Sequence, residues 1–203
     1  MVGKLIALEG IDGSGKSTQA KLLAESIGAD LTFEPGATGL GKVIRQSLLH
    51  SSSKEISISI EAEALLMIAD RAQDMAENIA PAIYSGKNVV TDRFSGSTIA
   101  YQGYGRGIDI GMLQDAIRLA TGSIEPALNV LLDIPVDKAM RRIADTGNQT
   151  DRMERLGIDF LDRVRQGYLS MASANPDNWY VLDCDRPIEE IAEMILSRVR
   201  DLL

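Results

Sequence analysis

Cysteine and histidine are nearly absent from this chain. Among 203 residues there is one cysteine, Cys184, and one histidine, His50. A single cysteine excludes an intrachain disulfide, and Cys184 has no second cysteine with which to bind a metal. A chain without disulfides fits a reducing compartment, and we therefore expect a cytoplasmic protein.

Long apolar runs and an excess of basic charge are also missing. No stretch approaches the ~18 apolar residues of a membrane-spanning helix. The short apolar start, Met1–Leu8, is followed at once by acidic residues and does not resemble a secretory signal. With 21 Lys and Arg against 29 Asp and Glu, the net charge is −8. This charge argues against a nucleic-acid surface and against electrostatic binding to a membrane.

Aromatic residues make up only 4% of the sequence, yet 45% of it is hydrophobic. The core must therefore consist mainly of aliphatic and methionine side chains, and the chain has enough of them to bury one. The length is that of one domain, which we expect to span residues 1–203.

Short apolar segments alternate with segments of helical periodicity. The predicted strands are Lys4–Glu9, Asp30–Phe33, Asn88–Thr91, Leu128–Asp133 and Trp179–Asp183. The predicted helices are Lys16–Ile27, Gly41–His50, Glu61–Ser85, Gly111–Ala120, Pro135–Ala144, Ile158–Ala174 and Pro187–Leu203, with a kink or restart at Pro81. This alternation predicts an α/β fold, in which a five-stranded parallel sheet is flanked by helices on both faces.

A glycine-rich, basic loop stands out in this acidic chain. Residues 10–17 read G-I-D-G-S-G-K-S and fit the phosphate-loop pattern G-x-x-x-x-G-K-[ST], with a strand before them and a helix after them. Glycines let successive backbone N–H groups turn toward an anion, and the helix start adds positive potential. Lys16 would bind the β- and γ-phosphates, and the Ser17 hydroxyl would bind Mg²⁺. ATP is the expected nucleotide, and its site would comprise Gly10, Ile11, Asp12, Gly13, Ser14, Gly15, Lys16, Ser17 and Thr18.

The phosphate loop alone does not identify the acceptor of the phosphoryl group. GTPases share the loop, but the guanine-reading N-K-x-D is missing, since the nearest match, Asn148–Asp151, lacks the lysine. A nucleotide-dependent regulatory switch stays an alternative, but the missing N-K-x-D argues against it. Arginines on separate segments, namely Arg45, Arg71 and Arg93, favour a kinase whose acceptor also carries phosphate.

Six segments in the same order resemble thymidylate kinase, a family of nucleoside-monophosphate kinases, over nearly the whole chain. They are residues 9–19 (E-G-I-D-G-S-G-K-S-T-Q), 34–36 (E-P-G), 69–73 (A-D-R-A-Q), 92–98 (D-R-F-S-G-S-T), 100–103 (A-Y-Q-G) and 151–168, which begins with D-R and ends at Tyr168. The resemblance implies ATP-dependent phosphorylation of dTMP to dTDP by direct in-line transfer, a phosphate-loop kinase fold with a small mobile lid, and a homodimer.

The resemblance also assigns roles to single residues. Arg45 and Arg93 would contact the acceptor phosphate, Arg71 the base, and Asp92 together with Ser17 would hold Mg²⁺. Tyr101 would crowd a ribose 2′-hydroxyl and so favour deoxynucleotides. The expected substrate-binding residues are Asp12, Glu34, Pro35, Arg45, Met67, Arg71, Arg93, Ser97, Thr98, Tyr101 and Gln102.

Two of these residues and one segment have a plainer interpretation. Arg71 without the resemblance would pair with Asp74 on a solvated helix face. Asp12, an acid beside bound phosphates, would be a helix N-terminal carboxylate if it did not orient the acceptor or an ion. Residues 101–105 (Y-Q-G-Y-G), taken alone, would be a flexible loop.

The predicted lid covers residues 141–156. Arg141, Arg142, Arg152 and Arg155 bracket a polar stretch there, although they could instead pair on the surface with Asp145, Asp151 and Glu154. In the family an arginine from the phosphate loop or from the lid stabilises the moving phosphoryl group, and this phosphate loop has no arginine. The predicted catalytic residues are therefore Asp12, Lys16, Arg93, Arg142 and Arg152.

The sequence departs from the family pattern at two acceptor-side positions. Phe33 stands where many members have an arginine, and Met67 stands where many have a phenylalanine that stacks on thymine. Methionine can still cover a base face. These departures leave open a kinase for another monophosphate, such as dUMP, or for a nucleoside.

Overall fold

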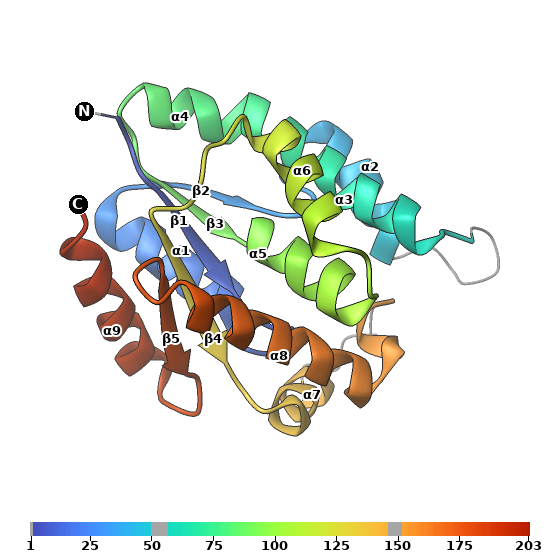
Figure 1. Cartoon of the computed structure of the whole chain (residues 1–203). Helices are drawn as coiled ribbons and strands as arrows, with labels where there is room; N and C mark the ends of the chain where they lie inside the picture. Colours follow the sequence, from blue (N-terminus) through green and yellow to red (C-terminus); the bar gives the residue numbers. More distant parts are fainter. Residues whose placement is uncertain (1, 50–56, 146–151) are drawn as a thin grey trace.

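The computed structural model describes residues 2–49, 57–145 and 152–203, and Figure 1 shows them arranged as a sheet between helices. The five strands are β1 (Leu5–Glu9), β2 (Asp30–Phe33), β3 (Val89–Asp92), β4 (Leu128–Asp133) and β5 (Trp179–Asp183). They pair in the order β2-β3-β1-β4-β5, and every pair is parallel. The predicted five-stranded parallel sheet is confirmed.

The helices cover the sheet and carry the connections between strands. They are α1 (Lys16–Ile27), α2 (Gly39–Leu49), α3 (Ile60–Asp74), α4 (Ala80–Tyr84), α5 (Ser95–Thr98), α6 (Ile110–Thr121), α7 (Val136–Asp145), α8 (Ile158–Ala174) and α9 (Ile188–Arg200), with π-helical segments η1 (Met75–Ile79) and η2 (Ile99–Gly105) and a 3₁₀ turn η3 (Glu154–Leu156). Helices α1 and α9 pack against each other (Figure 1), while α8 packs closely on η2. No helix in the described part of the chain is long and apolar enough to span a bilayer.

The boundaries of α1 were predictable because both ends carry a clear signal. The helix starts at Lys16, directly after Gly15, and ends before Gly28. Gly28 adopts a left-handed conformation with φ of 63°, and its N–H donates to the Ala24 carbonyl. Glycine is the residue best suited to this helix end, because it adopts positive φ without steric cost.

The long helix predicted over residues 61–85 is divided by a π-helical segment. Regular α-helix ends at Asp74, π-helix runs over Met75–Ile79, and α4 resumes at Ala80. Pro81 is the second residue of α4, and it has no N–H to donate to the preceding turn. The helix therefore changes its hydrogen-bonding register ahead of Pro81, as the expected restart implies.

The interpretation of residues 101–105 as a flexible loop is wrong. These residues belong to η2, which continues α5, and Tyr101, Gln102, Gly103 and Gly105 are buried. Their glycines serve close packing rather than flexibility. A Cβ on Gly105 would lie 2.7 Å from the Phe160 ring, and one on Gly167 would lie 2.6 Å from the Tyr104 ring.

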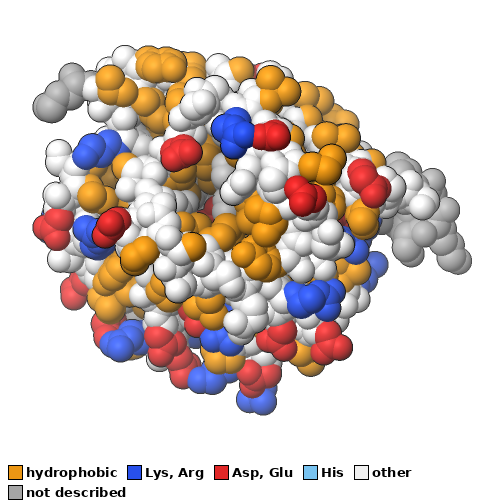
Figure 2. Space-filling model, viewed as in Figure 1, with side chains coloured by type: hydrophobic (Ala, Val, Ile, Leu, Met, Phe, Trp, Pro, Cys, Tyr) orange, Lys and Arg blue, Asp and Glu red, His pale blue; other side chains and the backbone are white. Residues whose placement is uncertain are grey.

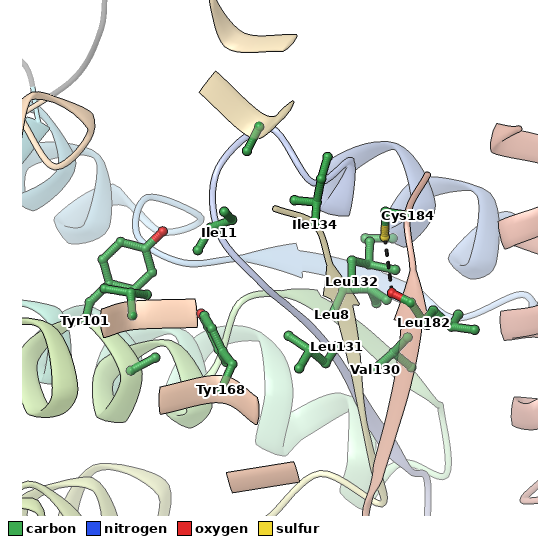
Figure 3. Close-up of a cluster of buried hydrophobic side chains, with 14 of the residues drawn as sticks. Leu8, Ile11, Tyr101, Val130, Leu131, Leu132, Ile134, Tyr168, Leu182 and Cys184 are labelled. Atoms are coloured by element: carbon green, nitrogen blue, oxygen red, sulfur yellow. Dashed lines mark hydrogen bonds between the residues drawn. The ribbon is translucent and has the colours of Figure 1, made fainter. Parts of the chain in front are cut away.

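The core lies on both faces of the central strands. Every residue of β1 is buried, and β4 is buried up to its last residue. Figure 3 shows the side chains of Leu8, Leu131, Leu132 and Leu182 clustered on the neighbouring strands β1, β4 and β5. Because the strands are parallel, the carboxyl ends of β1, β3 and β4 meet at one edge of the sheet, which is where ligands bind in open α/β folds.

The close approach of α8 to η2 predicts a stability effect at Gly167. In Gly167→Ala the new methyl group would overlap Tyr104, and we expect the free energy of unfolding to fall by about 1–3 kcal/mol in urea denaturation. The control is Gly39→Ala, where nothing lies within 4 Å, and there we expect no loss or a gain of up to about 1 kcal/mol. Equal stability of the two variants would contradict this packing.

Candidate active site

The phosphate loop connects β1 to α1 in a conformation that needs glycine. Gly10, Gly13 and Gly15 have φ of 141°, 79° and 94°. A Cβ on Gly10 would lie 2.6 Å from the Leu132 carbonyl oxygen, and one on Gly13 would lie 2.5 Å from the Ala139 carbonyl oxygen. Both the backbone angles and the close neighbours therefore exclude larger residues, and the loop forms a tight turn at the end of β1.

The Lys16 side chain folds back over the phosphate loop. Its ammonium donates to the Ile11 carbonyl at 2.8 Å and lies 3.8 Å from an Asp12 carboxylate oxygen. Burial and the positive charge of Arg93 lower the pKa of Lys16 below its usual value. The loop thus holds a desolvated cation that a phosphate group would stabilise.

Ser17 and Asp92 meet beside the loop, from α1 and the end of β3. The Ser17 hydroxyl donates to Asp92 Oδ2, whereas the buried Asp92 Oδ1 has no hydrogen-bond partner among the described residues. A hydroxyl and a carboxylate with a free oxygen fit a hard divalent cation such as Mg²⁺, which typically takes one or two protein ligands and completes its shell with phosphate and water. No cluster of three or more Asp, Glu, His or Cys suited to a metal occurs in the described ranges.

A cavity lies next to the phosphate loop, and it collects side chains from distant parts of the sequence. Its lining is Asp12, Glu34, Pro35, Arg45, Leu49, Met67, Arg71, Arg93, Ser97, Thr98, Tyr101, Gln102 and Met153. All eleven residues predicted to bind the acceptor line this cavity. We call it the acceptor cavity. Leu49 and Met153 also line it, and neither was among the predicted site residues.

A second cavity adjoins the acceptor cavity on the side of the phosphate loop. It is lined by Lys16, Ser17 and Asp92 together with Asp12, Glu34, Arg45 and Arg93, and these last four residues also line the acceptor cavity. We call it the phosphate-loop cavity. The two cavities therefore meet at a shared wall, where Arg45 also donates to the Pro35 carbonyl at 2.8 Å.

Arg93 is the most connected residue of that wall. Its guanidinium donates to Asp12 at 2.5 Å, to the Gly10 carbonyl at 3.1 Å and to Ser97 Oγ at 3.1 Å. It also lies over the ring of Tyr101. The backbone of Arg93 has φ of 76°, a left-handed conformation that is costly for a side chain of this size. Such strain, held by many contacts, is typical of functional positions.

The carboxylate of Asp12, unexpected beside a phosphate site, is compensated by this arrangement. Burial raises the pKa of Asp12, but Arg93 and Lys16 outweigh it and bring the pKa to about 2. Asp12 is therefore ionised at neutral pH. It also accepts a hydrogen bond from the Tyr101 hydroxyl at 3.2 Å, and Figure 3 shows that hydroxyl directed toward the loop of Ile11.

The alternative interpretation of Arg71, a surface pair with Asp74, is wrong. Arg71 is 2% exposed, and its guanidinium donates to Glu34 at 2.6 Å and to Thr98 at 2.9 Å. Asp74 instead accepts from Thr32 and Asn78. Burial raises the pKa of Glu34 to about 8, although Arg71 opposes the rise. Arg71 is thus fixed at the cavity wall by a buried acidic partner.

The two predicted lid arginines lie in different places. Arg142, on α7, donates to the Cys184 carbonyl at 2.8 Å and lies 3.5 Å from the Gly13 carbonyl of the phosphate loop. Arg152 pairs with Glu63 at 3.1 Å and donates to the Ile58 carbonyl. The structure therefore brings Arg142, but not Arg152, to the phosphate loop. Residues 146–151 of the predicted lid lie outside the described residues.

Two buried glutamates that the sequence did not mark as functional organise the site. Glu63 accepts from Gln102 and Arg106 and pairs with Arg152. Glu9 is fully buried, and burial raises its pKa, while hydrogen bonds from Ser97 and the charges of Arg93 and Arg71 oppose the rise. For Glu9 a signal existed, because an acid within the apolar strand Leu5–Glu9 must find buried partners.

Comparison with known proteins places this arrangement in a family. The family model described as thymidylate kinase matches residues 8–195. A thymidylate kinase from Desulforudis audaxviator is 43% identical over an alignment that covers 100% of this chain and 93% of the relative. One from Synechococcus sp. strain CC9902 is 39% identical, with 100% of both chains covered.

A solved structure agrees with the sequence comparisons. The crystal structure of thymidylate kinase from Ehrlichia chaffeensis superposes with a TM-score of 0.78 at 30% identity, and the match covers 98% of this chain and 99% of that chain. The fold and the sequence both match over nearly their full lengths. The chain therefore belongs to the thymidylate kinase family of nucleoside-monophosphate kinases.

Proposed function

We propose that this enzyme transfers the γ-phosphoryl group of ATP directly to dTMP, which yields ADP and dTDP. The observation that carries the proposal is the shared wall of the two cavities: Asp12, Glu34, Arg45 and Arg93 border both the phosphate-loop cavity and the acceptor cavity. Two nucleotides bound there would meet through their phosphates. In-line transfer needs this arrangement and no phosphoenzyme.

On the donor side, the backbone N–H groups of the loop and the ammonium of Lys16 would bind the triphosphate. Arg142 lies close enough to the loop to add positive charge at the transferred group. Ser17 and Asp92 would hold Mg²⁺, which supplies electrostatic stabilisation of the phosphates when bound. Asp92 has an oxygen available for this, because only its other oxygen accepts from Ser17.

On the acceptor side, Arg45 and Arg93 would bind the phosphate of dTMP, and Arg71 would reach the base together with Thr98 and Gln102. Both phosphate-binding arginines belong to the shared wall, and Arg71, Thr98 and Gln102 line only the acceptor cavity. The ring of Tyr101 is buried against this cavity and would leave little room for a 2′-hydroxyl. Asp12 would orient the acceptor from within the phosphate loop.

A catalytic role of Arg152 requires that it exchange partners. In the present arrangement its guanidinium is bound to Glu63, and Met153 beside it lines the acceptor cavity. We propose that Arg152 contributes to transfer only after it leaves Glu63, when the lid closes over the triphosphate and excludes water.

A kinase for another monophosphate, such as dUMP, is the second candidate. It is favoured by Met67, a flexible side chain that lines the acceptor cavity where a rigid ring would bind thymine more selectively. A regulatory switch has less support, because a protein that only binds and hydrolyses one nucleotide does not need the arginine-lined acceptor cavity beside the phosphate loop.

We also propose a homodimer. Large apolar side chains are exposed on neighbouring helices: Leu65 on α3 and Met112 and Leu119 on α6. Figure 2 shows apolar side chains gathered over this side of the molecule. A second copy of the chain would bury them.

The acceptor is tested by ADP release, coupled to a spectroscopic readout, with ATP and Mg²⁺ against a panel of monophosphates. We expect rapid ADP release with dTMP, slower release with dUMP because it lacks the 5-methyl group, and little release with dAMP, dGMP or dCMP. Equal rates with dUMP would favour the second candidate. Slow release that does not depend on any acceptor would contradict the kinase proposal.

Arg93→Ala tests the assignment of the acceptor phosphate. Because a donor aimed at the reacting phosphate is lost, we expect kcat/KM for dTMP to fall at least about 100-fold. ATP binding should change by less than about 3-fold, since Lys16 and the loop remain. The control is Arg200→Ala, on the exposed end of α9, which should leave both values unchanged. Unchanged dTMP kinetics in Arg93→Ala would contradict the assignment.

A further inference from the structure

Glu9 ends β1 with a fully buried carboxylate that four donors surround. Its Oε1 accepts from the backbone N–H groups of Phe94 at 3.0 Å and Ser97 at 3.2 Å. Its Oε2 accepts from the Ser97 hydroxyl at 2.6 Å and the Tyr168 hydroxyl at 3.2 Å. An ionised carboxylate offers only acceptors, so all four contacts suit the charged form.

The two backbone contacts fix the chain directly after Arg93. Helix α5 starts at Ser95 without a side-chain cap of its own, and Glu9 supplies the missing acceptor from a different strand. The carboxylate is pressed against this turn, because a Cβ on Gly96 would lie 2.8 Å from Glu9 Oε1. The hydrogen bond from the Phe94 N–H to Glu9 fixes the residue directly after Arg93, and this contact helps to hold Arg93 at its strained φ of 76°.

The two hydroxyl contacts connect Glu9 to the guanidinium of Arg93. Arg93 Nη1 donates to Ser97 Oγ at 3.1 Å and approaches the Tyr168 hydroxyl at 3.5 Å. The Ser97 and Tyr168 hydroxyl oxygens also lie 2.8 Å apart, so the two hydroxyls, Glu9 and Arg93 form one hydrogen-bond network. A hydroxyl that donates its proton to Glu9 leaves its oxygen free to accept from Arg93. We call the Ser97 and Tyr168 hydroxyls the platform of Arg93: the Glu9 carboxylate orients their protons, and their oxygens accept from the guanidinium.

We propose that Glu9 is a positioning residue for the acceptor phosphate: through Ser97, Tyr168 and the turn at Phe94 it holds Arg93 in its phosphate-binding orientation. The inference rests on the proposed role of Arg93. Glu9 itself lines neither the acceptor cavity nor the phosphate-loop cavity. Its effect on dTMP must therefore pass through other residues.

Glu9→Gln separates this role from simple packing, because the amide keeps the shape of the carboxylate and replaces one acceptor oxygen with a donor NH₂. If the NH₂ faces the hydroxyls, neither can donate to it. One hydroxyl can still donate to the other, since their oxygens lie 2.8 Å apart, but the remaining proton then turns toward the guanidinium, which has no acceptor. If it faces the Phe94 and Ser97 N–H groups, the turn loses its acceptor. Either way the support of Arg93 is lost.

The experiment is two-substrate kinetics on Glu9→Gln. We expect kcat/KM for dTMP to fall about 10- to 100-fold, the effect of one lost charge-assisted contact, while KM for ATP changes by less than about 3-fold. The matched control is Asp74→Asn, another fully buried carboxylate, which accepts from Thr32 and Asn78 and does not contact Arg93. Asp74→Asn should leave the ratio of KM for dTMP to KM for ATP unchanged. Unchanged dTMP kinetics in Glu9→Gln, or equal losses for both substrates, would overturn the proposal.

A double-mutant cycle distinguishes the failure of this inference from the failure of the proposed function. In an Arg93→Ala background, Glu9→Gln should reduce kcat/KM for dTMP by less than about 3-fold further, since the residue it positions is gone. A full additional loss would overturn the positioning role. If Arg93→Ala itself leaves dTMP kinetics intact, the proposed function of Arg93 fails; if only Glu9→Gln is silent, the positioning role alone fails.

Tyr168→Phe tests the positioning of Arg93 independently, in case Glu9→Gln does not fold. It removes one hydroxyl of the platform, and Tyr168 lies outside both cavities. We expect a smaller, dTMP-specific loss of about 3- to 10-fold that disappears in the Arg93→Ala background. An unchanged kcat/KM for dTMP in Tyr168→Phe, or a loss that persists without Arg93, would count against the platform.

Discussion

The ion pair between Asp12 and Arg93 joins the two halves of this site. Asp12 belongs to the phosphate loop and Arg93 to the turn after β3, and their contact of 2.5 Å forms the wall that both cavities share. It connects a glycine-constrained loop to an arginine with a strained backbone. Because the two strands are direct neighbours in the parallel sheet, the fold itself brings these residues together.

Carboxylates hold the arginines of the site in place; Glu34 and Glu63 are buried, and Asp12 is partly exposed. Glu34 pairs with Arg71, Glu63 with Arg152, and Asp12 with Arg93. Each pair pays a desolvation cost, but breaking it would leave an uncompensated charge, so the arginine stays fixed. The net charge of −8 therefore describes the exterior, where Figure 2 shows acidic and basic side chains mixed. It says little about the site, where acids serve to orient cations.

Local signals in the sequence were enough to predict the sheet, helix α1 and the phosphate loop, because strand burial, the Gly28 stop and the loop glycines are local effects. The acceptor cavity followed from the resemblance of separate motifs, not from any one of them. What could not be predicted depends on tertiary contacts. The glycines of residues 101–105 indicated a loop in the sequence, and only the packing of α8 against them shows that they belong to a buried helix. The pair of Arg152 with Glu63 joins residues far apart in sequence, so no local pattern predicts it.

In the proposed reaction, two nucleotides bind end to end across the Asp12–Arg93 wall. The most direct test is the affinity of a compound that links adenosine to thymidine through five phosphates. We predict that it competes with both ATP and dTMP and binds at least about 100-fold more tightly than either alone, since one molecule would occupy both cavities. Competition with ATP only, at an affinity no better than that of ATP, would contradict the account.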